Sequence, residues 1–491
     1  MRSLDPARSC SIAALWLAAS GFVRPIEAPP PCTCAALLEM TVDRVEDTYV
    51  GYHLEVDSVS RPEYDARTAA AREAAARPDA DCWEVIAEWI AGFGDPHLFL
   101  LEIPRFGPAE LDSLRRTAVH TGWTEATARV ALESFPSLDP LEGIWVRGGS
   151  RYAVLRDTAA TGSGTYEAIV LETDAEGWGP GELKARFEAR GDGGYEARYR
   201  MNDHSTRRYR ASVRRDGEIL VMPAIGWGRE WPAPEDRSTF EPSDPLAPTL
   251  SETEPGVFRA VVPSHDPGYR GRLDSLVTAA HERLLDARLL IVDLRGNGGG
   301  SSLTTSPLMP YIHAEPEREV PGPEGPPVVL ASADNLAYFT RWKSGEDTPA
   351  WLLDLLGRMG RSFGEVVPFQ DPPDTTRGWV PDTTYATPGD VAIVTDRAVG
   401  SAAEAFVLFA LHSPRVTTFG EPTRGMIDYQ NVGIVPVGCP GSGLYLGYPT
   451  IAASADLPLD GINATGLIPH VPLDLSRVDA VDEILAHYGG G

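Results

Sequence analysis

The chain has 491 residues, which is enough for two or three domains with large hydrophobic cores. Its net charge of −27 argues against nucleic acid or anionic membranes as partners, because both would be repelled. The hydrophobic share of 43% is that of an ordinary globular protein.

The N-terminus resembles a secretory signal peptide. Arg2 and Arg8 precede an apolar stretch from Cys10 to Val23, which is too short to span a bilayer comfortably, and Ala18-Ala-Ser offers a small-residue cleavage pattern. We therefore expect residues 1–20 to be removed. The mature chain, without a membrane span, is expected to be secreted or to lie in the periplasm or cell envelope. A proline-rich spacer follows over residues 21–34.

Four cysteines remain after this signal segment, namely Cys32, Cys34, Cys82 and Cys439. They allow three pairings, and a bond from Cys32 or Cys34 to Cys82 would fasten the start of the mature chain. No His or Cys pair stands near Cys32-Thr-Cys34, so we expect neither a metal nor another cofactor.

Helical periodicity marks the next segment, and we expect a helical domain over residues 35–135. Apolar residues recur at helical spacing from Leu38 to Tyr52, and an alanine-rich run covers Tyr64 to Ala76. A third helix should begin at Asp81, where Glu84 completes a capping-box pattern. The helices end at Gly94-Asp-Pro-His.

Short strand-like runs follow, separated by glycine and aspartate turns, and predict a small antiparallel barrel or sandwich over residues 140–225. Residues 226–250 are rich in Pro, Asp and Glu, which predicts a linker. From 251 to 491 strands alternate with helices, which predicts parallel βαβ units and an α/β fold.

Two buried strands of this last region lead into unusual loops. The strand that starts at Leu289 runs into Arg295-Gly-Asn-Gly-Gly-Gly, which lacks the spacing of phosphate or dinucleotide loops and favours donated backbone amides for an oxyanion. The strand Val391 to Val394 leads to Ser401 at a loop-to-helix junction. A serine there suits a helix cap or a nucleophile, and the local sequence leaves both open.

Four segments together resemble the C-terminal processing, or tail-specific, serine peptidases. They are Asp293-Leu-Arg-Gly-Asn-Gly-Gly-Gly, Gly400-Ser-Ala-Ala-Glu, Phe419-Gly-Glu-Pro-Thr-Arg-Gly and Gly466-Leu-Ile-Pro-His, with His470 in place of the usual aspartate. The resemblance implies a crotonase/protease-type spiral α/β core, with an N-terminal helical domain and an inserted small β domain.

The same resemblance assigns roles to site residues. Ser401 would be the nucleophile, and the oxyanion hole would come from the amide of Gly298 or Gly299 and that of Ala402. The better-known branch of the family uses a lysine base, but Arg424 stands in that region, and arginine stays protonated. The only lysines, Lys184 and Lys343, lie outside the matching segments.

The chain is therefore more similar to the tricorn-core and interphotoreceptor retinoid-binding-protein-like branch, where histidine is the base. Asp95-Pro-His97 matches that element, so His97 would take the proton from Ser401. His412, at the end of the helix after Ser401, is the alternative base. Asn463 stands where the family has the acid that orients the histidine, and Asp460 lies close by.

The sequence thus predicts a serine endopeptidase that cleaves unstructured peptides or protein C-terminal tails through an acyl-enzyme. Arg424 would either bind a substrate carboxylate or be a surface arginine. One alternative function is a catalytically inactive homologue that binds peptides or a small apolar ligand in the same groove. The other is acyl-thioester chemistry on the crotonase-like core, which would not need Ser401.

Overall fold

The computed structural model describes residues 32–489, apart from short segments at 57–58, 104–106, 158–163, 176, 192, 202–203, 215–216, 223–224, 234–241, 314–325, 371–382, 440–441, 456–461 and 476. The expected signal peptide, most of the spacer and Asp460 lie outside the described residues. Within the described ranges, no helix is long and apolar enough to cross a membrane. The mixed α/β class is confirmed, whereas the crotonase-type spiral stays a prediction.

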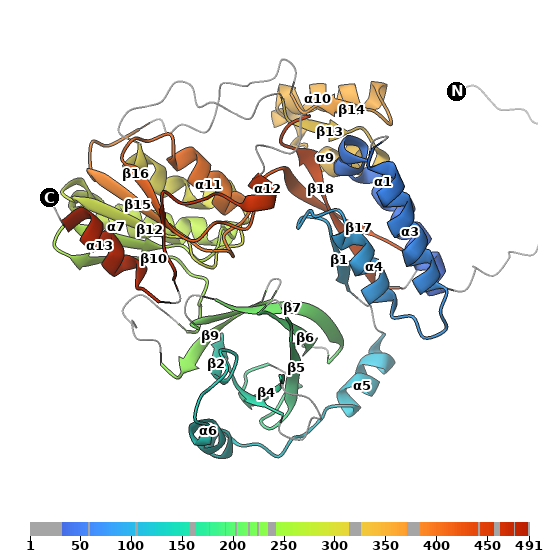
Figure 1. Cartoon of the computed structure of the whole chain (residues 1–491), viewed down its shortest axis with the longest axis horizontal. Helices are drawn as coiled ribbons and strands as arrows, with labels where there is room; N and C mark the ends of the chain where they lie inside the picture. The colour runs from blue at the N-terminus through green and yellow to red at the C-terminus, as the bar shows by residue number, and fades with distance from the viewer. Residues whose placement is uncertain are drawn as a thin grey trace, which may run out of the picture.

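A six-stranded sheet forms one end of the molecule (Figure 1). Its strands, in spatial order, are β10 (Thr249–Glu254), β11 (Val257–Val261), β12 (Leu289–Asp293), β15 (Asp390–Thr395), β16 (Val416–Gly420) and β19 (Val471–Pro472). All neighbours pair in parallel except β10 and β11, as the strand–helix alternation predicts.

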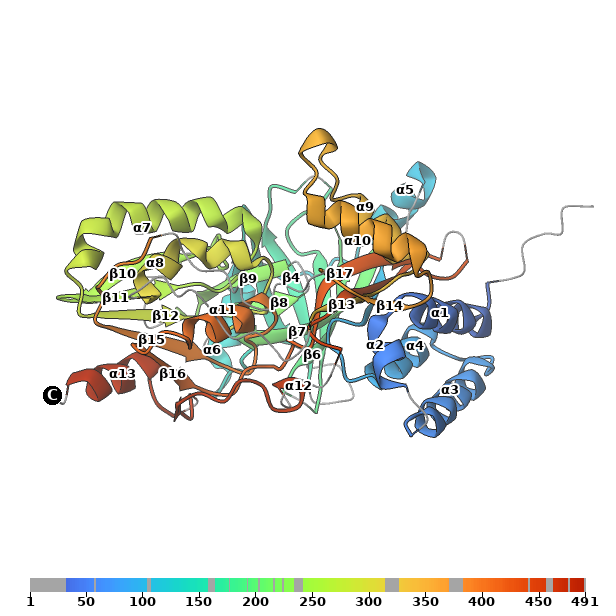
Figure 2. The same cartoon turned by 90° about the horizontal axis from the view of Figure 1, so that it is seen from above.

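Both faces of this sheet are covered, which explains its uninterrupted apolar strands. Leu290 and Val292 point into a core with α7 (Arg270–Leu285) and α11 (Ala402–Ala410). Leu289 and Ile291 point into a second core with α13 (Ala480–Gly489) on the opposite face. Figure 2 shows these helices on either side of the strands. The short η2 (Ser302–Leu308) and α8 (Met309–Ile312) extend the first core.

A second sheet combines strands from the two ends of the chain. It contains β1 (Phe99–Glu102), β18 (Leu444–Ala452), β13 (Val328–Leu330) and β14 (Val366–Pro368), with β17 (Tyr429–Pro436) paired to β18. The antiparallel pairing of β1 with β18 fixes the segment just before β1 against the C-terminal half.

The N-terminal helices share their core with this second sheet. They are α1 (Cys34–Thr48), α2 (Val50–Glu55), α3 (Arg61–Ala75) and α4 (Cys82–Ala91), the last capped by Asp81 as predicted. Their apolar residues and those of β13, β17 and β18 form one cluster. The helical segment is therefore not a separate domain over 35–135, because about a third of the buried residues in its core come from the C-terminal region. Helices α9 (Ala333–Thr340) and α10 (Ala350–Arg361) pack over β13 and β14.

The middle of the chain forms a closed antiparallel barrel. Its strands are β2 (Gly143–Arg147), β3 (Ser150–Arg156), β4 (Thr165–Glu172), β5 (Leu183–Ala189), β6 (Tyr195–Arg200), β7 (Thr206–Arg214), β8 (Ile219–Met222) and β9 (Ile225–Trp231). Large side chains such as Trp145, Phe187 and Trp227 fill the interior. Because β9 pairs with β2 to close the barrel, residues 225–231 are not linker as the sequence had suggested.

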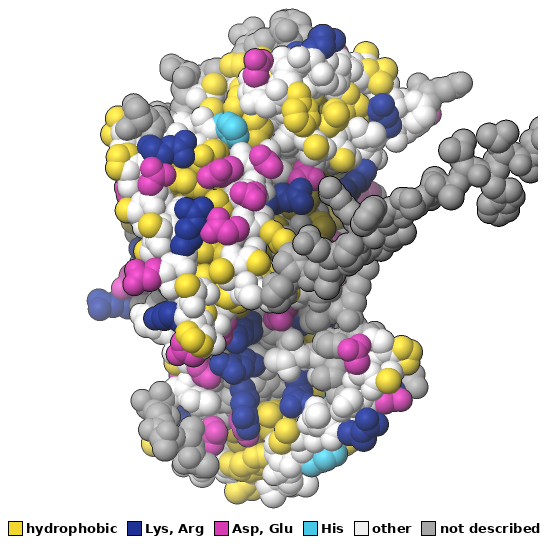
Figure 3. Space-filling view, turned by 90° about the vertical axis from the view of Figure 1, so that its right-hand side faces the viewer, with side chains coloured by type: hydrophobic (Ala, Val, Ile, Leu, Met, Phe, Trp, Pro, Cys, Tyr) yellow, Lys and Arg dark blue, Asp and Glu magenta, His cyan; other side chains and the backbone are white. Residues whose placement is uncertain are grey.

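Three smaller helices complete the fold: α5 (Pro108–Arg116), α6 (Glu125–Ser134), which packs on the barrel, and α12 (Ile462–Thr465). A wide cleft separates the barrel from the two sheets, and Figure 3 shows it as a hollow above the barrel.

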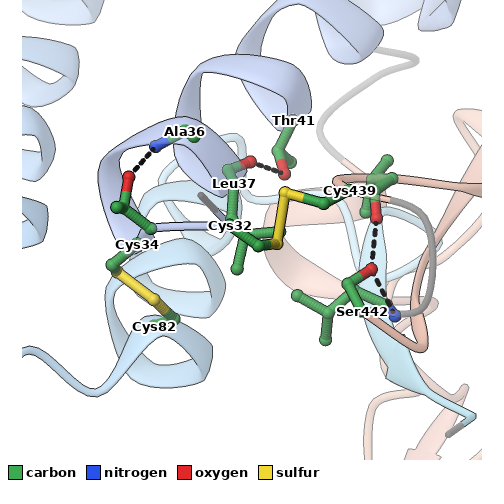
Figure 4. The surroundings of a disulfide bond; sticks show 11 residues. Cys32, Cys34, Ala36, Leu37, Thr41, Cys82, Cys439 and Ser442 are labelled. Carbon is green, nitrogen blue, oxygen red and sulfur yellow. Dashed lines mark hydrogen bonds between the residues drawn. A yellow bond between two sulfur atoms is a disulfide. The ribbon is translucent and has the colours of Figure 1, made fainter. Parts of the chain in front are cut away.

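Two disulfides hold the start of α1. Cys34 pairs with Cys82 of α4, one of the bonds that the sequence allowed, and Cys32 pairs with Cys439 in the loop after β17 (Figure 4). The second bond joins residues 407 positions apart and connects the first helix to the β17–β18 hairpin.

Removing the longer of these links should cost more stability. In the chain-entropy view a disulfide stabilises by restricting the unfolded chain, more so for a longer loop. The two loops span 407 and 48 residues, so loss of Cys32–Cys439 should cost about 2 kcal/mol more than loss of Cys34–Cys82. Denaturant unfolding of the double variants Cys32→Ser/Cys439→Ser and Cys34→Ser/Cys82→Ser compares them. Equal losses would contradict the entropic account.

Candidate active site

The two unusual loops meet at one edge of the six-stranded sheet. Strands β12 and β15 are parallel neighbours, with Asp293 opposite Val394, so their carboxyl ends coincide. The glycine loop leaves β12 there and the Ser401 loop leaves β15. The loops touch so closely that a Cβ on Gly299, whose φ is +101°, would lie 2.7 Å from Ser401 Cβ. Only glycine fits at this position.

Ser401 stands at the N-terminus of α11 in an unusual conformation. Its φ of +56° and ψ of −123° are rare for a residue with a side chain, and such strain is concentrated at functional sites. The following helix contributes its first backbone amides to the same edge.

His97 brings the second reactive group. Its Nε2 lies 3.0 Å from Ser401 Oγ, although the two residues are 304 positions apart. His97 immediately precedes the β1 region, and the pairing of β1 with β18 carries it to the end of α11. The serine hydroxyl thus faces the imidazole of His97, while the Ser401 amide donates to Glu404 at the start of α11. Asp95-Pro-His97 is the element that the sequence singled out.

Burial keeps the His97 imidazole neutral. Only 6% of the residue is exposed, and desolvation lowers the pKa of His97 to about 4, helped by the positive charge of Arg424 and opposed by the backbone of Tyr429. A neutral ring is the form that can accept the serine proton. No described residue hydrogen-bonds its Nδ1, and the nearest described carboxylate atom, Asp95 Oδ1, lies 3.8 Å away.

Asp95 is a site residue to which the sequence analysis gave no role. Its carboxylate accepts hydrogen bonds from the His97 amide at 2.8 Å and from the Tyr49 hydroxyl at 3.0 Å. Burial raises the pKa of Asp95 to about 7. The residue therefore fixes the backbone that carries His97, and the Asp-Pro-His sequence was the available signal.

Two backbone amides of the loops that meet at Ser401 are unpaired among the described residues. Within the described residues, no hydrogen bond is donated by Gly298 N or by Ala402 N. Gly299 N instead donates to Asn297 Oδ1 at 3.0 Å. Of the two glycines predicted for an oxyanion hole, Gly299 thus has an occupied amide, and the roles of Gly298 and Ala402 stay predictions.

Asn297 joins the two loops, a role that the sequence did not reveal. Besides accepting from Gly299, its side chain donates to Val262 O at 2.8 Å and bonds His265 Nδ1 at 2.7 Å. Its carbonyl accepts from Gly400 N at 3.0 Å. One buried residue thus fixes the glycine loop through its side chain and the residue before Ser401 through its backbone carbonyl.

Glu404 holds the opposite side of the site. Its fully buried carboxylate accepts from Ser401 N at 2.9 Å and from Thr423 Oγ1, Gly425 N and Met426 N at 2.5 to 2.8 Å. It therefore connects the start of α11 to the loop after β16.

The remaining predicted residues lie as follows. Asn463 does not bond His97; its Oδ1 accepts from Ile427 N at 2.9 Å and Asp428 N at 3.1 Å, so it anchors a turn instead of orienting the base. His412 lies at the far end of α11, roughly 15 Å along the helix from Ser401, and is excluded as the base. Arg424 follows β16 and faces the cleft.

Several solved structures resemble this chain at low identity. CPAF in complex with lactacystin is 12% identical, with a TM-score of 0.40, and the match covers 90% of this chain and 94% of CPAF. The photosystem II D1 C-terminal processing protease is 14% identical (TM-score 0.35; 93% and 97% covered). A lipoprotein from Streptococcus agalactiae is 12% identical (TM-score 0.37; 94% and 98% covered).

No protein-family model matches the chain, and no curated protein matches it either. The likenesses to solved structures are distant, so the function proposed below rests on the geometry of the site.

Glu404→Gln tests the role of the buried carboxylate. The new amide group would face backbone and hydroxyl donors in place of an accepting oxygen, leaving at least one of them unsatisfied. We expect a loss of roughly 1–3 kcal/mol in the free energy of unfolding. Chemical denaturation measures it, with Glu483→Gln on the exposed face of α13 as the control. An equal effect of the two variants would contradict the assignment.

Proposed function

We propose that this protein is a serine peptidase of the C-terminal processing type, similar to the tricorn-like branch that uses histidine as its base. The observation that carries the proposal is the 3.0 Å contact between His97 Nε2 and Ser401 Oγ at a strained turn beside two backbone amides. Each residue has the chemistry that acyl transfer requires.

In the proposed reaction, neutral His97 takes the proton from Ser401 as Oγ attacks the carbonyl carbon of the scissile peptide. The oxyanion that forms is held by the amides of Gly298 and Ala402, at the positive end of α11. His97 then gives the proton to the leaving amine, and an acyl-enzyme remains. Water, deprotonated by the same histidine, releases the acyl group and regenerates Ser401.

This mechanism differs from the well-known triad in what supports the histidine. Asn463 contacts a turn, and Asp95 lies beyond hydrogen-bond distance of Nδ1. We assign Asp95 as a positioning residue that holds the His97 backbone. Asp460 stays a candidate acid on the sequence alone.

The proposed substrates are unstructured peptides or protein C-terminal tails. The cleft beside Ser401 has a volume of about 2950 Å³ and is lined by the barrel as well as by both sheets, which favours an extended chain over a compact small molecule. The two disulfides support an oxidising compartment, in keeping with the proposed secretion or envelope location.

The first test is peptide cleavage by the mature protein and by Ser401→Ala and His97→Ala. New termini in a diverse peptide mixture are read by mass spectrometry. We expect each substitution to lower the cleavage rate by at least about 10³-fold, because nucleophile and base act as a unit. Activity retained by Ser401→Ala would favour acyl-thioester chemistry instead. Absence of cleavage by the wild type would favour the inactive, ligand-binding homologue.

The pH dependence tests the state of His97. Because burial and Arg424 lower the pKa of His97 to about 4, the base should stay neutral, and kcat/KM should hold, as the pH falls from 6.5 until it approaches 4. Arg424→Gln removes a positive charge near the ring, so the acid limb should move to higher pH. Arg198→Gln, on the exposed surface of the barrel, should leave the limb in place. A wild-type midpoint near 6.5 would refute the assignment.

A further inference from the structure

The cleft that leads to Ser401 has a wall made by the barrel. Strand β7 contributes Arg210 and Arg214 to this wall, and the loop after β16 contributes Arg424 from the other side. In Figure 3, dark-blue basic side chains gather in the hollow where the barrel meets the rest of the molecule. A basic surface is unexpected in a chain of net charge −27.

Two of these arginines lie directly beside the reactive loops. Arg214 Nη1 donates to Gly296 O at 2.6 Å and lies 3.7 Å from where a Cβ on Gly298 would stand. Arg424 packs its Cβ 3.6 Å from where a Cβ on Gly400 would stand, and its amide donates to Val399 O at 2.8 Å. The Arg214 guanidinium therefore lies against the glycine loop, and the Arg424 backbone lies against the loop that carries Ser401.

The carboxylate of Asp396, beside these loops, is already occupied by backbone amides. Asp396 accepts from the amides of Gly296, Ala398 and Val399 at 2.9 to 3.2 Å, and so serves as an anchor of both loops. The negative charge of Glu404 favours the Arg424 cation, but no described acceptor hydrogen-bonds the Arg424 guanidinium. The positive charge of Arg424, which lines the cleft, is thus only partly neutralised by neighbouring carboxylates.

The arginines also repel one another. Burial is the first cause that lowers the pKa of Arg424 and the charge of Arg210 is the second, while the charge of Glu404 opposes the shift. For Arg214, burial again comes first, while Asp396 opposes the shift and Arg424 adds to it. Clustered, partly desolvated cations are costly, and a bound anion would offset that cost.

We propose that Arg210, Arg214 and Arg424 form an anion subsite that binds a carboxylate of the peptide substrate next to Ser401, so that the barrel selects acidic peptides. Arginine forks hold carboxylates by paired hydrogen bonds, which would also orient the chain. The inference rests on the proposed peptidase function and assigns the barrel a role in specificity. The carboxylate could belong to an Asp or Glu side chain or to a C-terminus.

Binding to the full chain carrying Ser401→Ala separates recognition from cleavage. Three fluorescein-labelled decapeptides of one Gly/Ser sequence serve as probes in fluorescence anisotropy. The first has three Glu residues and an amidated C-terminus, the second has Gln at those positions and an amidated C-terminus, and the third has Gln and a free C-terminal carboxylate. The first or the third should bind at least about 10-fold more tightly than the second, and which one does so identifies the source of the carboxylate.

The same measurement on arginine variants locates the subsite. Arg210→Gln, Arg214→Gln and Arg424→Gln should each reduce the preference for the anionic peptide by about 10-fold. Arg198→Gln makes the same change of charge on an exposed part of β6 that does not line the cleft, and it should retain the preference. Arg214→Gln removes the contact to Gly296 O and so could disturb the fold. Arg210 is exposed, so Arg210→Gln tests the subsite without that disturbance.

Two results would overturn the subsite: equal affinity for all three peptides, or an equal loss with Arg198→Gln. The proposed peptidase function fails separately. If the anionic peptides bind as expected but the wild-type chain cleaves no peptide, the subsite stands and the peptidase does not. If the wild type cleaves acidic and neutral peptides at equal rates, the peptidase stands and the subsite does not.

Discussion

The parallel register of β12 and β15 is the constraint on which the site depends. Because Asp293 lies opposite Val394, two loops that leave the sheet about a hundred residues apart begin side by side. Asn297 and Glu404 then fix what the register brings together, the first by linking the glycine loop to Gly400 and the second by linking Ser401 to the loop after β16. Both are buried, so the strained backbone of Ser401 is held by groups that would be costly to leave unpaired.

A second constraint delivers the histidine. His97 belongs to the N-terminal helical segment, whose core is shared with strands from the last quarter of the chain. The β1–β18 pairing and the Cys32–Cys439 bond both cross from one end of the chain to the other. The His97 side chain is therefore positioned by tertiary contacts at some distance from its contact with Ser401. This arrangement ties the geometry of the Ser401–His97 pair to the stability of the second sheet.

The sequence predicted the parts of the molecule that have local signals. Apolar runs that end in glycine or small residues identified the strands and loops of the parallel sheet, and the missing lysine directed attention to His97. The shared core of the helices and the second sheet had no local signal, because it depends on pairing between distant segments. For the same reason Asn297, Asp95 and the arginines of β7 were missed, and Asn463 was given a contact with His97 that it does not make.

Arg424 connects recognition with chemistry in the proposed enzyme. Its positive charge is the second cause, after burial, that lowers the pKa of His97, which makes the imidazole a weaker base while the cleft is empty. A substrate carboxylate bound at the arginine cluster would neutralise part of that charge and raise the pKa of His97 toward its ordinary value. The histidine would then accept the Ser401 proton more readily with an acidic peptide in place. Binding of the substrate carboxylate, although remote from the scissile bond, would thus raise kcat as well as lower KM. An acidic peptide would be preferred in the chemical step and in binding.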